Sequence, residues 1–191
     1  MKFIAPDDDR WQSLEPAGAA ATTDAAWATL QPLPHRLLSN AQWQTLRARW
    51  PAGLPTGLLL DNTDDVEALA ADLPRLALIV LTFPQWTDGR AYSQARLLRL
   101  RLRYAGELRA SGAVLVDMLP LLQRTGFDSA QLRADQRPDA ARRALGHFDG
   151  CSDGRFDGHY QGDARQPRPH FSRHAGASRL LRSDHTAAVA A

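Results

Sequence analysis

The stretch LALIVLTF at residues 76–83 decides the fold class. It is apolar at almost every position rather than at every second one, which is typical of a strand that is covered on both faces of a parallel sheet. Shorter strand-like segments lie at 58–60, 107–111 and 129–133, and a helical pattern follows each of the four. Four strands that alternate with helices predict parallel pairing through right-handed crossovers. We therefore expect an α/β fold with an open, mainly parallel four-stranded sheet and flanking helices.

Helix boundaries are predicted from capping residues and from apolar residues at helical spacing. One short helix should follow the capping box Ser39-x-x-Gln42, and the four that alternate with the strands are expected at 64–73, at 89–104, at 113–124 and after Pro138. The helix at 89–104 is the longest of them. Pro120 should either kink the next helix or confine its start, because proline lacks the N–H that a helical hydrogen bond needs.

Changes of composition along the chain predict its organisation. Residues 1–38 mix charged turns, alanines and prolines, so we expect an irregular N-terminal segment with at most a short strand near Phe3 and Ile4. Residues 39–149 should form a single α/β domain. Residues 150–191 contain few large apolar side chains and repeated Asp-Gly pairs, which predicts a flexible tail.

Composition excludes several classes of chemistry. The chain has 191 residues, and all but one of its 23 lysines and arginines are arginine, the exception being Lys2. Phosphate-binding loops and Schiff-base enzymes need an ordered lysine and are therefore excluded. The single cysteine, Cys151, excludes an internal disulfide and a four-thiolate metal site.

Charge and hydropathy indicate the compartment and the partners to expect. The formal net charge is only +2, which does not favour a nucleic-acid partner. No segment approaches the roughly 18 apolar residues of a membrane span, and the first residues turn acidic before a signal peptide could form. We therefore expect a cytoplasmic protein that binds neither nucleic acid nor membrane.

The loop after the 76–83 strand carries the best candidate for a binding site. It lies within FPQWTDGRAYSQAR at 83–96, at the carboxyl end of a buried strand, where α/β sheets bind ligands. Thr87 or Asp88 can cap the following helix, Gly89 allows close approach of the backbone, and free N–H groups together with Arg90 suit an anion. The alternative is structural: Thr87 and Asp88 only cap, Arg90 pairs with a carboxylate, and Tyr92 packs.

The longest helix also carries a line of arginines opposite its alanine and leucine face. Adjacent guanidinium groups repel one another unless carboxylates or an anionic partner compensate them. The candidate internal carboxylates are Glu107, Asp117, Asp128 and Asp135, and the competing interpretation is that an acidic ligand or protein docks there. The full set of candidate ligand-binding residues is Thr87, Asp88, Gly89, Arg90, Tyr92, Arg96, Arg99 and Arg109.

The remaining motifs indicate no reaction. His170-x-x-x-His174 has the spacing of helical metal ligands but no third ligand nearby, so no metal site is predicted. Ser93 lies in no Gly-x-Ser-x-Gly motif, and no Gly-x-Gly-x-x-Gly sequence occurs. Catalytic residues and cofactors stay unknown, and whether the protein is an enzyme is left open.

Several motifs resemble those of the bacterial domain of unknown function family 934. They are DVEALAADLP at 65–74, FP at 83–84 with TDGR at 87–90, YSQARLLR at 92–99, GELRA at 106–110, GFD at 126–128 and YQ at 160–161. The resemblance is closest over residues 57–148. The chain departs from the family pattern at Trp86, Ala91, Ala113 and Met118.

This resemblance implies a biological setting. Genes of the family typically lie beside those of assimilatory sulfite reductase, and members are sometimes labelled probable oxidoreductases. An accessory role in sulfite and sulfate reduction is thereby implied, exerted by binding an anionic ligand or a partner protein, and the alternative is a cofactor-dependent oxidoreductase of the same pathway. The candidate partners are sulfite reductase or another sulfate-assimilation protein, an anionic small molecule, and a second copy of the chain.

Overall fold

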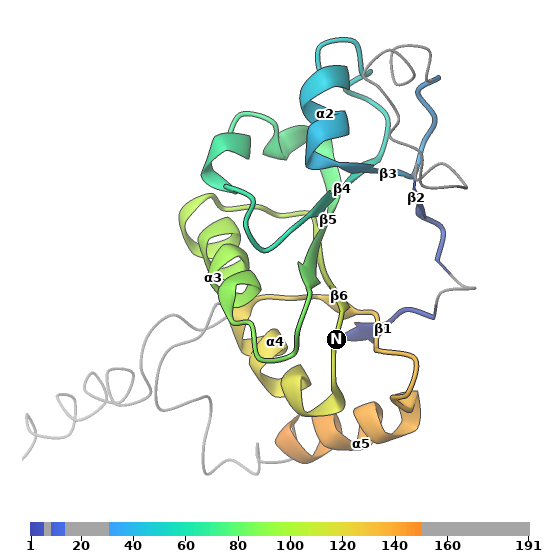
Figure 1. Ribbon diagram of the computed structural model, residues 1–191, viewed down its shortest axis with the longest axis vertical. Coiled ribbons are helices and arrows are strands. Elements are labelled where there is room, and N and C mark those ends of the chain that lie inside the picture. Colours follow the sequence, from blue (N-terminus) through green and yellow to red (C-terminus); the bar gives the residue numbers. More distant parts are fainter. Residues whose placement is uncertain (6–8, 14–30, 150–191) are drawn as a thin grey trace, which may run out of the picture.

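The computed structural model describes residues 1–5, 9–13 and 31–149, and these form an α/β fold around a parallel sheet (Figure 1). The sheet has seven strands in the order β1-β7-β6-β5-β4-β3-β2, and every neighbouring pair is parallel. The strands are β1 (Lys2–Phe3), β2 (Gln12–Ser13), β3 (Arg36–Ser39), β4 (Thr56–Leu60), β5 (Leu76–Phe83), β6 (Glu107–Gly112) and β7 (Ser129–Ala130).

The predicted class and parallel pairing are confirmed, but the predicted number of four strands is wrong. The four expected strands correspond to β4, β5, β6 and β7. The other three lie within residues 1–39, and the sequence predicts 1–38 to be irregular. The expected short strand near Phe3 is one of them, as β1. Strands of two residues, such as β1 and β2, are too short to leave a hydrophobic period in a sequence. The predicted tail, 150–191, lies outside the described residues.

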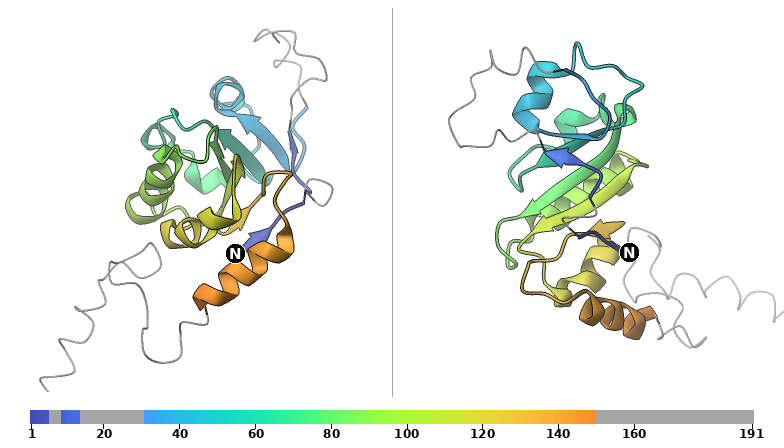
Figure 2. Two further views of the ribbon diagram at one scale, coloured as in Figure 1. Left: turned by 60° about the horizontal axis from the view of Figure 1, so that its bottom comes forward. Right: turned by 90° about the vertical axis from the view of Figure 1, so that its right-hand side faces the viewer.

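The order of the strands resembles that of a closed α/β barrel with one break. From β2 to β7 each strand lies beside the next one in the chain, and β1 then pairs with β7 at the far edge. In a closed barrel β1 would also pair with β2, but here these two strands are the edges of a curled sheet. Crossovers of one hand place the helices on one face, and Figure 2 shows them around the outside of the strands.

The helices follow the sequence predictions in part. They are α2 (Asn40–Leu46), α3 (Arg90–Arg96), α4 (Leu119–Thr125) and α5 (Pro138–Asp149), and α3 continues as a π-helical turn, η4 (Leu97–Arg101). The capping box is confirmed: the Gln42 N–H donates to Ser39 Oγ and the Ser39 N–H donates to Gln42 Oε1. Pro120 lies in the first turn of α4, after a 3-10 turn, η5 (Val116–Met118), so it confines the start of the helix.

The helix predicted at 64–73 is wrong. Two 3-10 turns, η2 (Glu67–Leu69) and η3 (Leu73–Arg75), take its place between β4 and β5. Asp64 does not cap a helix there, because its carboxylate accepts hydrogen bonds from the Asp61 N–H at 2.7 Å and from Asn40 Nδ2 at 2.8 Å. Of the apolar stripe expected for this helix, Val66, Leu69 and Leu73 are nevertheless buried, whereas Ala70 is exposed. Successive 3-10 turns also bring residues three apart onto one side.

Two hydrophobic clusters cover the two faces of the sheet. The larger one joins the sheet to the helices, with Trp43, Ile79, Phe83, Leu98 and Leu122 among its members. The smaller one lies on the helix-free face, where Trp11 packs against Leu78 and Val80. A Cβ at Gly57 would lie 3.0 Å from the Trp11 ring, so glycine at this position makes room for the indole. Of the helices in the described residues, none is long and apolar enough to cross a membrane.

Candidate functional site

The loop between β5 and α3 is anchored at the carboxyl edge of the sheet. Asp88 accepts a hydrogen bond from Asn62 Nδ2, in the loop after β4, at 2.5 Å, and the Asp88 N–H donates to the Gln85 carbonyl at 3.1 Å. Arg90 donates from Nε and Nη2 to the same carboxylate, at 3.1 and 2.7 Å. Asp88 thus ties together two successive loops of this edge and compensates the charge of Arg90.

The Asp88–Arg90 pair is ionised over the whole physiological range. The hydrogen bond from the Arg90 guanidinium lowers the pKa of Asp88 to about 2, and the same bond raises the pKa of Arg90. Of the two interpretations that the sequence leaves open for Arg90, the geometry agrees with pairing to a carboxylate. An anion at this loop would have to compete with Asp88 for the guanidinium.

Neither Thr87 nor Gly89 has a specialised role in the backbone geometry. The N-cap of α3 is Gly89, with φ −84° and ψ −3°, which has no side chain to cap the helix. Asp88 Oδ1 instead accepts a hydrogen bond from the N–H of Arg90, the first residue of α3, at 3.1 Å, so of the two predicted capping residues Asp88 takes that role. A Cβ at Gly89 would meet nothing within 4 Å, so close approach of other described atoms does not require glycine. Thr87 is exposed.

Tyr92 and Arg96 point to different surroundings on α3. The Tyr92 ring lies edge-on against Phe83, with centroids 5.0 Å apart, and burial raises the pKa of its hydroxyl to about 12. Tyr92 therefore packs against Phe83, as the structural interpretation of this loop predicts. Arg96 is exposed and forms no ion pair with another residue in the described part of the chain.

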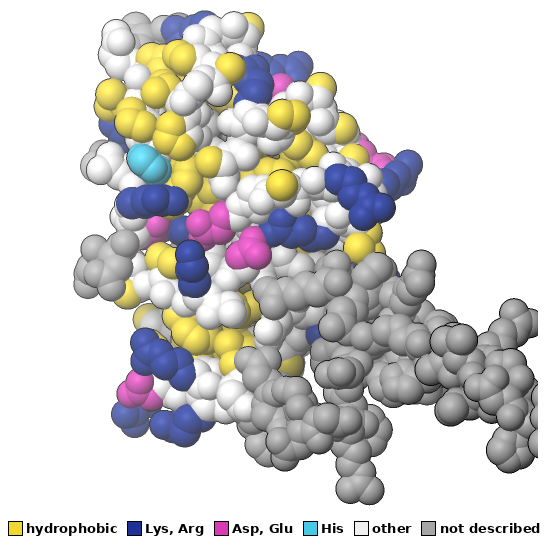
Figure 3. Space-filling view, turned by 180° about the vertical axis from the view of Figure 1, so that it is seen from behind, with side chains coloured by type: hydrophobic (Ala, Val, Ile, Leu, Met, Phe, Trp, Pro, Cys, Tyr) yellow, Lys and Arg dark blue, Asp and Glu magenta, His cyan; other side chains and the backbone are white. Residues whose placement is uncertain are grey.

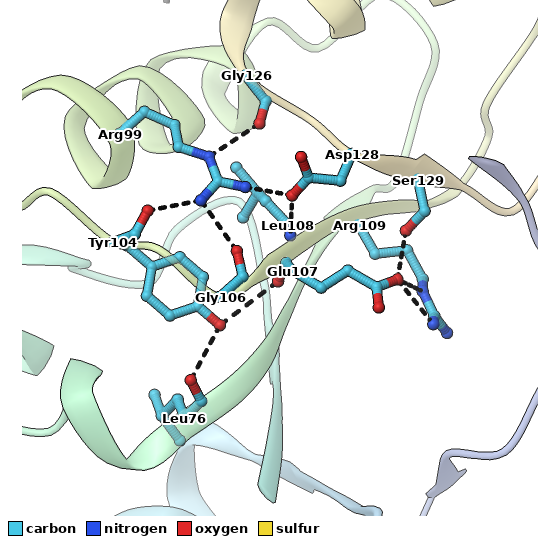
Figure 4. Close-up of polar contacts among 10 residues, drawn as sticks. All are labelled: Leu76, Arg99, Tyr104, Gly106, Glu107, Leu108, Arg109, Gly126, Asp128 and Ser129. Atoms are coloured by element: carbon cyan, nitrogen blue, oxygen red, sulfur yellow. Dashed lines mark hydrogen bonds and ion pairs between the residues drawn. The ribbon is translucent and has the colours of Figure 1, made fainter. Parts of the chain in front are cut away.

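Arg99 lies at the opposite, amino-terminal edge of the sheet (Figure 4). Its guanidinium forms an ion pair with Asp128, and it donates to the carbonyls of Tyr104, Gly106 and Gly126 at 2.5, 2.9 and 2.9 Å. These acceptors belong to the segments that lead into β6 and β7. Asp128, one of the four candidate carboxylates in the sequence, is thus the partner of Arg99. The hydrogen bonds of Arg99 join the two segments that lead into β6 and β7.

Arg109 lies on the helix-free face, in the middle of β6. Its side chain is 4% exposed and is paired with Asp9 at 2.6 Å and with Glu107 at 3.0 Å. Ser129 Oγ donates to Glu107 at 2.6 Å. Burial alone would raise the pKa of Glu107, but the hydrogen bonds from Ser129 and Arg109 outweigh it, and the pKa lies below its ordinary value.

The eight candidate residues therefore do not form one site. Residues 87–90 lie at the carboxyl edge of the sheet, Arg99 at the amino edge, and Arg109 on the helix-free face. Ligand binding by any of them stays a prediction. Sequence reasoning treats Trp86 only as a departure from the family pattern, yet it is 57% exposed in this loop, and its neighbours in the sequence are polar. Tryptophan is one of the residue types that are enriched among those that dominate protein interfaces.

Many arginines of the described residues are used within the fold. Ion pairs hold Arg47, Arg75, Arg90, Arg99, Arg101, Arg109, Arg133 and Arg142. Viewed from behind, acidic and basic side chains lie next to one another in a band across the molecule, between hydrophobic areas above and below (Figure 3). On that face, positive charge is accompanied by negative charge rather than gathered into a patch.

A pocket of about 640 Å³ opens at the carboxyl ends of β1, β6 and β7, where the chain enters α5. It is lined by residues 3–5, 112, 131–134, 136, 138 and 142. None of the eight candidate residues lines it. Its walls come from three strand ends that are far apart in the sequence, and no local motif marks them.

In the described residues, no group of three His, Cys, Asp or Glu side chains is arranged so that it could bind a metal ion. The His170 and His174 pair and Cys151 lie outside the described residues.

A family model described as bacterial protein of unknown function (DUF934) matches residues 57–171. No curated protein matches the chain. The matched range begins at the second residue of β4 and extends past α5, so it includes the anchored loop and the β6 and β7 walls of the pocket, whereas β1 to β3 precede it.

Proposed function

The chain belongs to the DUF934 family of bacterial proteins of unknown function, and we propose that it is a cytoplasmic accessory protein of assimilatory sulfite reduction that docks a partner protein at the carboxyl edge of its sheet. The pathway is proposed from the resemblance to the family. The partner we propose is sulfite reductase or another sulfate-assimilation protein.

The observation that carries this proposal is the exposure of Trp86 on an anchored loop. More than half of its surface is open to solvent, while Asp88, two residues further on, is bonded to Asn62 and to Arg90. A large aromatic side chain exposed on a fixed loop contributes little to the core, and tryptophan and arginine are enriched among the residues that dominate protein interfaces. Arg96, exposed on the following helix, adds a charge that suits an acidic partner.

The docking proposal is tested by binding of the purified protein to purified sulfite reductase, measured by biolayer interferometry. We expect Trp86→Ala to abolish the signal, and Arg96→Gln to weaken it most at low ionic strength, because exposed charges are screened by salt. Leu121→Ala is the matched control, since Leu121 is 43% exposed on α4. Equal binding by Trp86→Ala and Leu121→Ala, or no binding by the wild-type protein, would overturn docking to sulfite reductase through Trp86.

The pathway is tested separately in the bacterium. Deletion of the gene should slow growth with sulfate as the sulfur source and leave growth on cysteine unchanged. A deletion strain that grows equally well on both sources would contradict the proposed pathway.

A cofactor-dependent oxidoreductase is the second candidate. It is favoured by the pocket of about 640 Å³ at the carboxyl edge, which is the edge where α/β barrels bind their ligands. This candidate predicts a chromophore, or tight binding of flavin or nicotinamide, in protein purified without denaturation. A colourless preparation that binds neither cofactor would dismiss it.

A further inference from the structure

We infer that the pocket between the carboxyl ends of β1, β6 and β7 and the start of α5 binds a small organic anion, with an apolar body and one acidic group. The inference deepens the binding of an anionic ligand expected from the sequence and places it away from residues 87–90. It does not depend on docking at Trp86, because no residue of that loop lines the pocket.

The position of the pocket favours a binding function. All strands of the sheet are parallel, so their carboxyl ends meet at one edge, and α/β barrels and open α/β sheets bind ligands at that edge. The pocket lies where β1, β7 and β6 follow one another in the sheet. Its volume of about 640 Å³ is in the usual range for small-molecule sites.

Backbone hydrogen bonds fix the walls of the pocket. The Ile4 N–H donates to the Ala130 carbonyl at 3.0 Å, and the Arg133 N–H donates to the Val114 carbonyl at 3.0 Å. Gly112 has φ +90°, and a Cβ there would lie 2.4 Å from the Phe83 carbonyl oxygen, so the turn after β6 requires glycine. A wall built in this way is largely formed before a ligand binds, which reduces the entropic cost of binding.

The lining residues indicate the chemistry of the ligand. Apolar side chains make up much of the wall, including Phe3, Ile4, Leu132 and Pro138, and they suit an apolar body. The charged residues that line the pocket are Arg133 and Arg142, and no carboxylate lines it. Two guanidinium groups with no acidic side chain in the lining favour an anion.

The ion pairs of the two arginines leave donors for a ligand. Arg133 uses Nε and Nη2 for Asp135, both at 2.6 Å, and Arg142 uses Nη1 for Asp139 at 2.8 Å. A guanidinium has five N–H donors, so each arginine retains some of them. All four side chains are exposed, and exposed pairs of this kind contribute little to stability. An anion therefore binds through the N–H donors that Asp135 and Asp139 leave unused, beside the two ion pairs rather than in place of them.

The test uses benzoate, benzenesulfonate and phenyl phosphate as probes, with benzamide as the neutral analogue and inorganic sulfate as an anion without an apolar body. Binding to the full-length protein is followed by backbone amide shifts in ¹H–¹⁵N spectra. We expect at least one aromatic anion to shift the amides of Gly112 and residues 131–134, and to bind about tenfold more tightly than benzamide or sulfate. No such shifts for any probe up to about 10 mM, or equal binding of benzamide, would overturn the inference.

Variants locate the binding site. Arg133→Gln and Arg142→Gln should each weaken binding of the best probe about tenfold, and the double variant should abolish it. Arg137→Gln is the matched control, an exposed arginine of the same segment that does not line the pocket. Undiminished binding by the double variant would overturn the inference. Trp86→Ala should bind the probe as the wild type does, so failure of the docking proposal and failure of this one are distinguishable.

Discussion

Asp9 and Arg109 are 100 residues apart in the sequence, and their side chains form an ion pair of 2.6 Å on the helix-free face of the sheet. Asp9 belongs to the segment between β1 and β2, the two strands at the edges of the sheet. Arg109 lies in β6, beside central strand β5. The pair therefore fastens Asp9, which stands between the two edge strands in the sequence, to a strand in the interior of the sheet.

Removal of the Arg109 charge should be strongly destabilising. Arg109→Met leaves the Glu107 and Asp9 carboxylates without their cation in a site where the Arg109 side chain is only 4% exposed. Breaking a buried pair in this way costs about 3–5 kcal/mol of unfolding free energy. Urea denaturation measures the loss. Arg142→Gln, which removes an exposed pair, should change stability by less than about 1 kcal/mol. Similar losses in the two variants would contradict the importance assigned to the Arg109 pair.

Stability should fall in acid in part through Glu107. Its pKa in the folded protein lies below the ordinary value of 4.5, so its carboxylate stabilises the fold above that pH. This contribution is lost as the pH falls through the folded pKa, because the unfolded chain then binds the proton more readily. Between about pH 5 and about pH 3, wild-type protein should lose more unfolding free energy than Glu107→Gln. Parallel pH profiles for the two proteins would show that the Glu107 pKa is not lowered.

Arg99 should be needed for stability, and Arg96 should not. The planar guanidinium of Arg99 donates hydrogen bonds to Asp128 and to three backbone carbonyls. The single nitrogen of a lysine cannot reproduce that geometry. Both Arg99→Lys and Arg99→Gln should lower the unfolding free energy by about 2–4 kcal/mol. Arg96→Gln, on the exposed part of α3, should change it by less than about 0.5 kcal/mol. If Arg99→Gln were as stable as the wild type, the alternative interpretation that Arg99 binds an anionic partner would be favoured instead.

The elements that the sequence predicts well are those whose evidence is local. The strand at 76–83 has the predicted ends, because burial on both faces gives an uninterrupted apolar run, and the Ser39 capping box forms as its spacing implies. The prediction of a helix at 64–73 is wrong although the large apolar residues of this segment are buried. Val66, Leu69 and Leu73 suit a helical stripe, but they are buried equally well by two 3-10 turns.

What the sequence does not predict depends on residues that are distant along the chain. A helical wheel gives the direction of Arg99 relative to α3, but not that a turn before β7 brings Asp128 to it. The partner of Arg109 lies at position 9, and the pocket is assembled from residues near 4, 112, 132 and 142. Two-residue strands bring these segments together, and their pairing leaves no periodic signal.

Alanine substitution of two glycines should have opposite effects. At Gly112, φ is +90° and the new Cβ would lie 2.4 Å from the Phe83 carbonyl oxygen, so Gly112→Ala strains the backbone at the turn and displaces the wall of the pocket. We expect a loss of about 1–3 kcal/mol in unfolding free energy, together with shifts of the amides of residues 131–134.

At Gly89, φ is −84° and a Cβ meets nothing within 4 Å. Gly89→Ala should therefore leave stability unchanged or raise it by up to about 1 kcal/mol, because alanine restricts the unfolded chain. Urea denaturation of both variants measures the two changes in unfolding free energy. A loss at position 89 as large as that at 112 would mean that the loop before α3 needs its glycine for a close approach that the described residues do not make.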